Sequence, residues 1–314
     1  MMISKIHTKQ LQKVSFEDIK GWVHDNHLDA FTVLNKSTKY DLLDQKMLNN
    51  NMARRYFEKN YQPYRVLRKQ NEVSLYTGYY EPSLNASSVK TEEYLYPLYG
   101  SPKNKSEKFV NLTRRELEEK IYWDLPILAW LSDPVGLYFM HIQGSGSLKF
   151  ENGTERRFVF SSKNNYEYTS IGRYLTDNNY IKKTRISMGS IKKWMIRSPE
   201  NLSKKYINKS FIFFKEDLKD DVNPHPLGQI GIRLTPFRSL AVDMSIYNAN
   251  TPIWLDTKIP IKDSKKAERF QRLMFAQDKG SAIKGLLRGD IFFGNDENAG
   301  NMKSQGDIIV FEVI

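Results

Sequence analysis

Short apolar segments separated by turn residues fill the C-terminal third of the chain. They predict strands at 211–214, 229–234, 240–242, 253–255, 272–276, 290–293 and 308–313. Short strands joined by turns that contain Gly, Pro or Asn are typical of closed β-barrels, because closure leaves no unpaired sheet edge. We therefore expect the C-terminal part of the protein to be a closed β-barrel.

The N-terminal segment has a helical pattern. Ser15 and Asp18 have the spacing of a helix capping box, and they predict a helix over residues 15–36. A second helix is expected over 40–60, because Pro63 ends the pattern. These helices should lie at the periphery of the β-rich part.

The middle of the chain mixes strands and short helices. Asn152-Gly153 is a strong hairpin signal, and Thr113 with Glu116 predicts a capping box at the start of a helix. Residues 143–147 have the composition of a tight loop. Strands are expected at 73–82, 93–99, 136–142 and 158–161, and helices at 113–122, 170–175, 187–197 and 199–207. The predicted fold class is mainly β with peripheral helices (α+β).

Composition narrows the function classes. The 314 residues carry a net charge of +12, which favours an anionic partner. The basic residues are scattered and no nucleic-acid-binding motif accompanies them, so we do not expect nucleic acid as a partner. The chain has no cysteine, which excludes disulfides and thiolate catalysis. No apolar stretch is long enough to span a bilayer as a helix.

Two carboxylates mark the candidate site. Asp278 and Asp290 flank the Gly-rich segment 280–285, and the apolar run 291–293 follows Asp290 directly. Apolar surroundings can raise the pKa of an Asp until it donates a proton near neutral pH. On the local pattern alone, a plain hairpin whose Asp and Gly residues serve turn geometry is the favoured interpretation.

His24 and His27 have a spacing that a metal site could use. No third ligand accompanies them in the sequence, so solvated histidines are the better interpretation. We expect neither a metal nor a cofactor.

Four motifs occur in a characteristic order: TGYYEP at 77–82, HIQGSG at 141–146, YTSIG at 168–172 and DKGSAIKG at 278–285. Together they resemble the membrane-bound lytic murein transglycosylase A family, whose C-terminal module is named for three aspartates. The resemblance runs from about residue 73 to the C-terminus. It implies a double-psi β-barrel, a mostly β domain inserted into it, and a groove between the two. The implied barrel domain comprises residues 1–81 and 213–314, and the implied inserted domain comprises residues 82–212.

The resemblance also implies an activity. The family cleaves the β-1,4 bond between N-acetylmuramic acid and N-acetylglucosamine in peptidoglycan without water, and it leaves a 1,6-anhydro ring. The C6 hydroxyl of the substrate is the nucleophile, so one carboxyl can serve first as acid and then as base. The family assigns this role to the position of Asp290. Asp278 is expected either to stabilise developing positive charge or to cap a turn, and Asp243 is expected to be structural.

Other residues are expected to bind substrate. The resemblance places Gln143, Gly144 and Ser145 in a sugar-contacting loop. Thr77, Tyr79 and Tyr80 either line the groove or pack in the barrel.

Two basic residues near the acids have an open role. Lys284 and Arg288 are expected to bind the acids or the muramyl carboxylate, and a solvated side chain is an equal alternative for Lys284. The expected partner is the peptidoglycan glycan strand, bound by a monomer.

The sequence departs from the family pattern in three ways. Ser281 stands where the family usually has Gly, and Asn248 begins a segment (248–251) where many members have a Pro-containing turn. The given sequence shows neither a signal peptide nor a lipobox cysteine, although the resemblance implies a cell-envelope or periplasmic location.

Two alternative functions remain open at this stage. The first is a hydrolytic muramidase that uses Asp278 as a second catalytic carboxylate. The second is a glycan-binding module without catalysis, and the presence of both acids argues against it.

Overall fold

The protein divides into two compact units in the computed structural model, which describes residues 10–37, 49–103, 107–218, 225–261, 264, 266–280 and 282–314. Unit 1 comprises Met1–Tyr79 and His225–Ile314, and unit 2 comprises Tyr80–Pro224. The sequence places the boundaries at 81/82 and 212/213 instead. The second boundary differs because β9 (Ile212–Glu216) pairs with β8 (Glu155–Lys163) inside unit 2.

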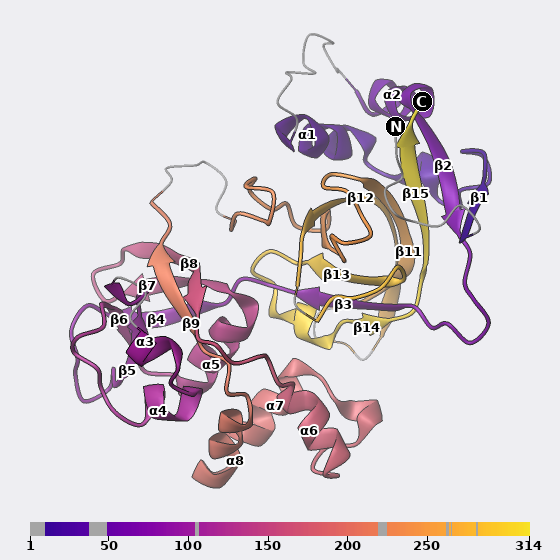
Figure 1. Ribbon diagram of the computed structural model, residues 1–314. Coiled ribbons are helices and arrows are strands. Elements are labelled where there is room, and N and C mark those ends of the chain that lie inside the picture. Colours follow the sequence, from indigo (N-terminus) through magenta and orange to yellow (C-terminus); the bar gives the residue numbers. More distant parts are fainter. Residues whose placement is uncertain are drawn as a thin grey trace. The chain divides into compact units, whose positions relative to one another are not determined.

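A nine-stranded sheet forms unit 1. Its strands in spatial order are β1 (Leu11–Lys13), β2 (Tyr61–Val66), β15 (Asp307–Val313), β11 (Pro252–Pro260), β12 (Ala267–Asp278), β10 (Ser239–Ala241), β13 (Arg288–Phe292), β3 (Leu75–Tyr79) and β14 (Lys303–Ser304). Figure 1 shows β11 and β12 curving around β13 and β3. The Thr257 hydroxyl on β11 donates to the carbonyl of Gln305, next to β14, at 2.7 Å. The end of the strand order therefore lies beside β11, so the sheet curves back on itself.

The local hairpin interpretation of residues 275–297 is wrong. Strand β10 lies between β12 and β13, parallel to β12 and antiparallel to β13. A strand from outside the segment therefore separates the two strands that carry the acids. The C-terminal strands are as predicted apart from 229–234, where the described residues form only an isolated bridge between Leu227 and Arg233.

The first N-terminal helix begins later than predicted. Asp18 accepts hydrogen bonds from Ser15 in a turn, and Gly21, with φ of 80°, interrupts the expected helix. Helix α1 (His27–Ser37) starts only after this point. Helix α2 (Asn50–Asn60) is capped by the Asn49 side chain, and residues 40–48 of that prediction lie outside the described residues.

An aromatic cluster joins these helices to the barrel. The Trp22 ring lies 5.4 Å from Trp254 on β11 and 5.5 Å from Phe311 on β15, between ring centroids. His27 is buried against Trp22 rather than solvated. Burial of these large rings accounts for much of the hydrophobic stabilisation on this side of the barrel.

Unit 2 contains a six-stranded sheet and short helices. Its strands in spatial order are β5 (Tyr96–Tyr99), β6 (Ile127–Leu131), β4 (Ser83–Ser87), β7 (Ser145–Phe150), β8 and β9. Its helices are α3 (Glu107–Val110), α4 (Arg114–Glu118), α5 (Pro134–Gln143), α6 (Ile171–Asp177), α7 (Met188–Met195) and α8 (Pro199–Ser203). The Asn152-Gly153 hairpin and the Thr113 capping box are confirmed.

The predicted strand at 136–142 is wrong, because these residues belong to helix α5. Asp133 caps the helix, Pro134 occupies its first turn, and Gly144 ends it with φ of 84°. The helix is buried on nearly every side, so its sequence shows no polar face and resembles a buried strand. The expected loop at 143–147 is correspondingly short, because Ser145 already begins β7.

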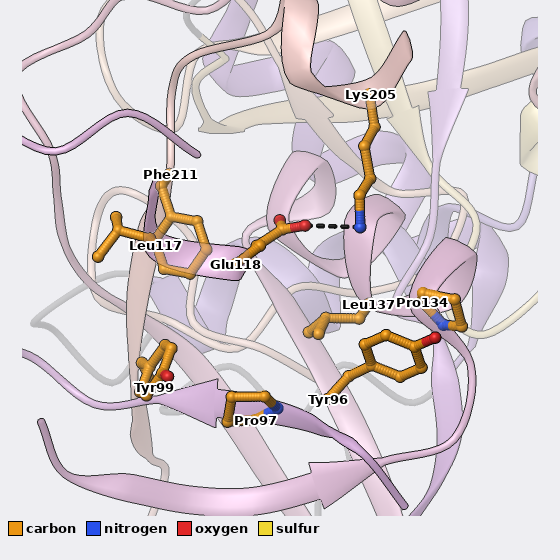
Figure 2. A pocket seen from close by; sticks show the side chains of 9 residues that line it. All are labelled: Tyr96, Pro97, Tyr99, Leu117, Glu118, Pro134, Leu137, Lys205 and Phe211. Atoms are coloured by element: carbon orange, nitrogen blue, oxygen red, sulfur yellow. Dashed lines mark ion pairs between the residues drawn. The ribbon is translucent and has the colours of Figure 1, made fainter. Parts of the chain in front are cut away.

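A small cavity lies in unit 2 beside a buried ion pair (Figure 2). Lys205 Nζ and Glu118 Oε2 are 2.6 Å apart at its edge. The other lining residues are Tyr96, Pro97, Tyr99, Leu117, Pro134, Leu137 and Phe211. Its volume of about 20 Å³ has room for one water molecule, so it is not a sugar site.

Candidate active site

Strands β3 and β13 bring the central pair of the site together. They are parallel, and their register places Asp290 opposite Thr77 and Arg288 opposite Leu75. Side chains of paired residues lie on the same face of a sheet. The Thr77 hydroxyl donates a hydrogen bond to Asp290 Oδ1 at 2.6 Å. Segments more than two hundred residues apart in sequence thus meet at one carboxyl group.

The surroundings of Asp290 favour its protonated form. Burial raises the pKa of this carboxyl to about 6, and the nearby Asp278 adds to the rise. The Thr77 hydrogen bond and the Arg288 guanidinium act in the opposite direction. A carboxyl with a pKa of about 6 can both donate and accept a proton near neutral pH.

Asp278 ends β12 and has a different set of partners. Its Oδ2 accepts from the Tyr79 hydroxyl at 2.9 Å, and its Oδ1 accepts from the backbone N–H of Gln229 at 3.1 Å. Burial raises the pKa of this carboxyl, and these donors lower it. Burial also keeps the pKa of Tyr79 well above its usual range, so that residue stays a donor. Asp278 therefore uses both oxygens as acceptors.

Strand β10 explains why the two acids lie near each other. Ala241 on β10 is the register partner of both Asp278 on β12 and Asp290 on β13. The acids consequently lie at the same level of the barrel, one strand to either side of Ala241. A hairpin of β12 and β13 would not have produced this placement.

Asp243 holds the turn between the two acids. Its Oδ2 accepts from the backbone N–H of Gly285 at 2.9 Å, and its Oδ1 accepts from the backbone and hydroxyl of Ser245. These bonds, Ser245 first, lower the pKa of Asp243. Lys284 is exposed and its charge acts on Asp243. Lys284 therefore belongs to the turn that carries the chain from β12 to β13, and Asp243, which follows β10, binds that turn at Gly285.

The remaining predicted residues lie in unit 2. Gln143 ends α5, and its side-chain oxygen accepts from the backbone N–H of Tyr80 at 3.2 Å. The Tyr80 ring is buried, and its hydroxyl accepts from Lys192 Nζ at 3.0 Å. Gly144 caps the helix and Ser145 is buried at the start of β7. The structure thus groups Tyr80 with the Gln143 loop, and groups Thr77 and Tyr79 with the acids.

Two contributors to the site have only a weak signal in the sequence. Arg288 Nη2 donates to Thr77 Oγ1 at 2.9 Å, so the guanidinium reaches Asp290 through Thr77. Arg288 precedes Asp290 by two residues on the same strand, so the two side chains lie on one face of the sheet. This relation can be read from the sequence. Gln229 acts through its backbone N–H, and no residue pattern could have identified it. In the described part of the chain, no three His, Asp or Glu side chains converge as a metal site requires.

Comparison with known proteins places the chain in a family. Residues 75–215 match the MltA specific insert domain, and residues 238–312 match the 3D domain. A membrane-bound lytic murein transglycosylase A homolog of Buchnera aphidicola is 34% identical over 236 residues, which are 72% of this chain and 62% of the relative. The solved structure of the lytic transglycosylase LtgG of Burkholderia pseudomallei is 31% identical, with a TM-score of 0.67, and the match covers 97% of this chain and 95% of that one. The chain belongs to the membrane-bound lytic murein transglycosylase A family.

Other members of the transglycosylase A family add detail. The structure of Escherichia coli MltA with bound chitohexaose has a TM-score of 0.74 and 25% identity, and the match covers 92% of this chain and 90% of that one. The chain spans about 62% of the length of the first curated relatives that it matches. The predicted fold class, mainly β with peripheral helices, is confirmed by these structural matches.

Proposed function

We propose that the protein is a lytic transglycosylase that cleaves the β-1,4 bond between N-acetylmuramic acid and N-acetylglucosamine in peptidoglycan without water. One observation carries the proposal. Asp290 has a pKa of about 6, and only one of its oxygens is held, by Thr77. Asp278 has both oxygens occupied. Asp290 can therefore exchange a proton, whereas Asp278 is held by hydrogen bonds at both oxygens. This arrangement suits a reaction in which the substrate supplies the nucleophile.

In the first step, protonated Asp290 gives its proton to the glycosidic oxygen as the bond from C1 to that oxygen breaks. Positive charge then develops at C1 and the ring oxygen of the muramic acid. Asp278 stabilises this charge as a fixed carboxylate held by Tyr79 and Gln229. The geometry of Asp278 suits electrostatic stabilisation better than proton exchange.

In the second step, Asp290 is a carboxylate and accepts the proton of the C6 hydroxyl. The C6 oxygen bonds to C1 and closes the 1,6-anhydro ring. Asp290 ends the cycle protonated, as it began, so the reaction consumes neither water nor a cofactor. A pKa of about 6 suits both directions of transfer.

Hydrolysis is the alternative chemistry for the same site. Glycoside hydrolases need a second carboxylate as base or nucleophile. The candidate nearby is Asp278, and both of its oxygens already accept hydrogen bonds, which disfavours it as a base or nucleophile. Mass spectrometry of muropeptides released from purified peptidoglycan distinguishes the two, since an anhydro product is lighter than a reducing product by one water. Reducing muramic acid ends as the main product would overturn the proposal.

Variants assign the roles. Asp290→Asn should lower the rate of anhydro product release by at least about a hundredfold, because general acid–base catalysis contributes this much. Asp278→Asn should also lower the rate, because it removes the negative charge, but by less than Asp290→Asn, because it leaves the proton exchange at Asp290 in place. Asp307→Asn, the same change at an exposed position of β15, is the matched control and should be active. Unchanged activity in Asp290→Asn would remove the catalytic assignment of Asp290, whereas a lack of any glycan cleavage by the unmodified protein would favour a glycan-binding module.

The proposed partner is the peptidoglycan glycan strand, and we propose that a monomer acts on it in the cell envelope. Relatives named membrane-bound lytic murein transglycosylase A support this location. Among the described residues, no helix is both long and apolar enough to cross a membrane. Analytical ultracentrifugation tests the monomer, and cell fractionation of the native host tests the location.

A further inference from the structure

Arg288 is fixed on the sheet beside the catalytic carboxyl. Its Nη1 donates to the carbonyl oxygens of Leu75, at 3.2 Å, and Gly289. Its Nη2 donates to Thr77 Oγ1 at 2.9 Å. The guanidinium is thus bonded to both β3 and β13, and one of its N–H groups points at the threonine hydroxyl. A planar guanidinium held at three acceptors has little freedom to reorient.

The numbers of donors and acceptors on Arg288 and Thr77 decide the direction of the hydrogen bond between Thr77 and Asp290. A guanidinium has five N–H donors and no acceptor, so Thr77 Oγ1 must be the acceptor of the bond from Arg288. A threonine hydroxyl has a single hydrogen. That hydrogen lies on the 2.6 Å contact with Asp290 Oδ1, so Oδ1 is the acceptor there.

This chain of donors makes the two oxygens of Asp290 unequal. A proton on Oδ1 would face the Thr77 hydrogen, which would then have to leave Asp290 and turn to a direction where the described residues offer it no hydrogen-bond partner. The hydrogen bonds of Thr77 therefore favour the proton of the acid form on Oδ2 over Oδ1. Within the described part of the chain, Oδ2 has no hydrogen-bond partner.

We propose that Arg288 is a positioning residue that acts through Thr77 to place the transferable proton of Asp290 on Oδ2. This inference rests on the proposed function of Asp290 as acid and base. It gives the reaction a single oxygen for both proton transfers. Without the relay, the Thr77 hydroxyl could rotate, and the proton would be shared between Oδ1 and Oδ2.

A simple charge effect is the competing explanation. Asp278, Arg288 and Asp290 are the charged groups that influence one another here, with the phenols of Tyr79 and Tyr76 beside them. A positive charge at Arg288 lowers the pKa of Asp290 whether or not Thr77 is present. A charge effect survives replacement of Arg by Lys and removal of the Thr hydroxyl, whereas a relay does not.

The test is a double-mutant cycle with Thr77→Val and Arg288→Lys. Val has the shape of Thr without the hydroxyl, and Lys keeps the charge without the planar fork. Each single variant should lower kcat by about tenfold or more, and the double variant should be no more than about twofold worse than Thr77→Val. Thr77→Ser retains the hydroxyl and should stay within about threefold of the unmodified protein. Thermal unfolding of each variant checks that it folds.

A second readout does not depend on turnover. Carbon-13 NMR of labelled aspartate, assigned with Asp290→Asn, measures the pKa of the Asp290 carboxyl. Both Thr77→Val and Arg288→Lys should raise this pKa, since each removes or loosens the hydrogen bond that lowers it. If Arg288 acts by charge alone, the Lys variant keeps the pKa of the unmodified protein.

The outcomes separate this inference from the proposed function. Losses in kcat that multiply in the double variant, or an unchanged pKa in Arg288→Lys, overturn the relay even when the unmodified protein makes anhydro ends. Absence of anhydro ends overturns the proposed function, and the NMR titration still decides the relay.

Discussion

At the scale of single residues, the two acids are chemically identical and differ only in their partners. Asp278 receives hydrogen bonds at both oxygens, whereas Asp290 receives one at Oδ1 from Thr77. Burial raises the pKa of both carboxyls, and that of Asp290 to about 6. The division of roles therefore comes from the number of donors around each carboxylate, and it can be tested by titration.

The activity of the protein should decline as the pH rises above about 6. Asp290 must be protonated to act as the acid, and its pKa of about 6 sets the point where the protonated fraction of the free protein is half. The alkaline limb of kcat/KM against pH, measured on peptidoglycan, checks this. A limb that stays flat up to pH 8 would contradict Asp290 as the group that limits the acid step.

Asp290→Asn should stabilise the protein at neutral pH although it lowers the activity. The folded state holds the Asp290 proton more tightly than the unfolded chain does, so the contribution of this group to stability falls as pH rises from about 4 to about 6. A pKa of about 6, against 3.8 for a free aspartate, costs at most about 3 kcal/mol at pH 7. Urea unfolding of both proteins at pH 7 and at pH 4 measures the difference, which should vanish at pH 4. Equal stability at pH 7 would show that the raised pKa is absent.

At the scale of elements, a buried ion pair joins the N-terminal helix region to the barrel. Arg238, just before β10, donates to both oxygens of Asp25 at 2.8 and 2.9 Å and to Asp29 on α1 at 2.6 Å. It also donates to the carbonyl of Leu273 on β12. The side chains of Arg238 and Asp25 are only 1% and 2% exposed. Arg238 therefore joins β12 to helix α1 and to the segment before that helix, in addition to the backbone pairing of β10 with β12.

Asp25→Ala should lower the free energy of unfolding by about 3–5 kcal/mol, because it leaves the Arg238 guanidinium buried without its main partner. Arg269→Ala is the matched control. It removes a bidentate pair with Asp256 on the surface of β11 and β12, and exposed pairs contribute about 0–1 kcal/mol. Chemical denaturation of the two variants measures the contrast. Equal losses would mean that burial does not govern the strength of this pair.

At the scale of the whole molecule, the chain carries a net charge of +12. Each unit has its own sheet and core, and the acids of the site lie in unit 1. Peptidoglycan carries carboxylates on its muramic acid and peptide stems. A basic protein is therefore attracted to it over distances longer than a hydrogen bond.

Binding of the protein to purified peptidoglycan should weaken as salt is raised from about 0.05 M to about 0.5 M, because screening shortens the range of attraction from more than about 10 Å to less than about 5 Å. Co-sedimentation with cell-wall sacculi at a fixed protein concentration measures this. Asp290→Asn suits the experiment, since it prevents digestion during the assay. Binding that does not change with salt would contradict a role for net charge.

The sequence by itself determined the β-rich fold class, the family and the two acids. Local patterns sufficed for elements with a clear cap or turn, such as the Thr113 capping box and the Asn152-Gly153 hairpin. They failed for α5, because a helix buried on nearly all sides has no polar face to reveal its period.

Only the tertiary structure decided how the acids are arranged and what each one can do. Strand β10 lies between β12 and β13. No feature of residues 275–297 predicts that a strand from earlier in the chain will pair between the two strands of this segment. The partners of Asp290 and Asp278 come from β3 and from a backbone N–H, both distant in sequence. A pKa depends on burial and on such contacts, which exist only after the chain has folded.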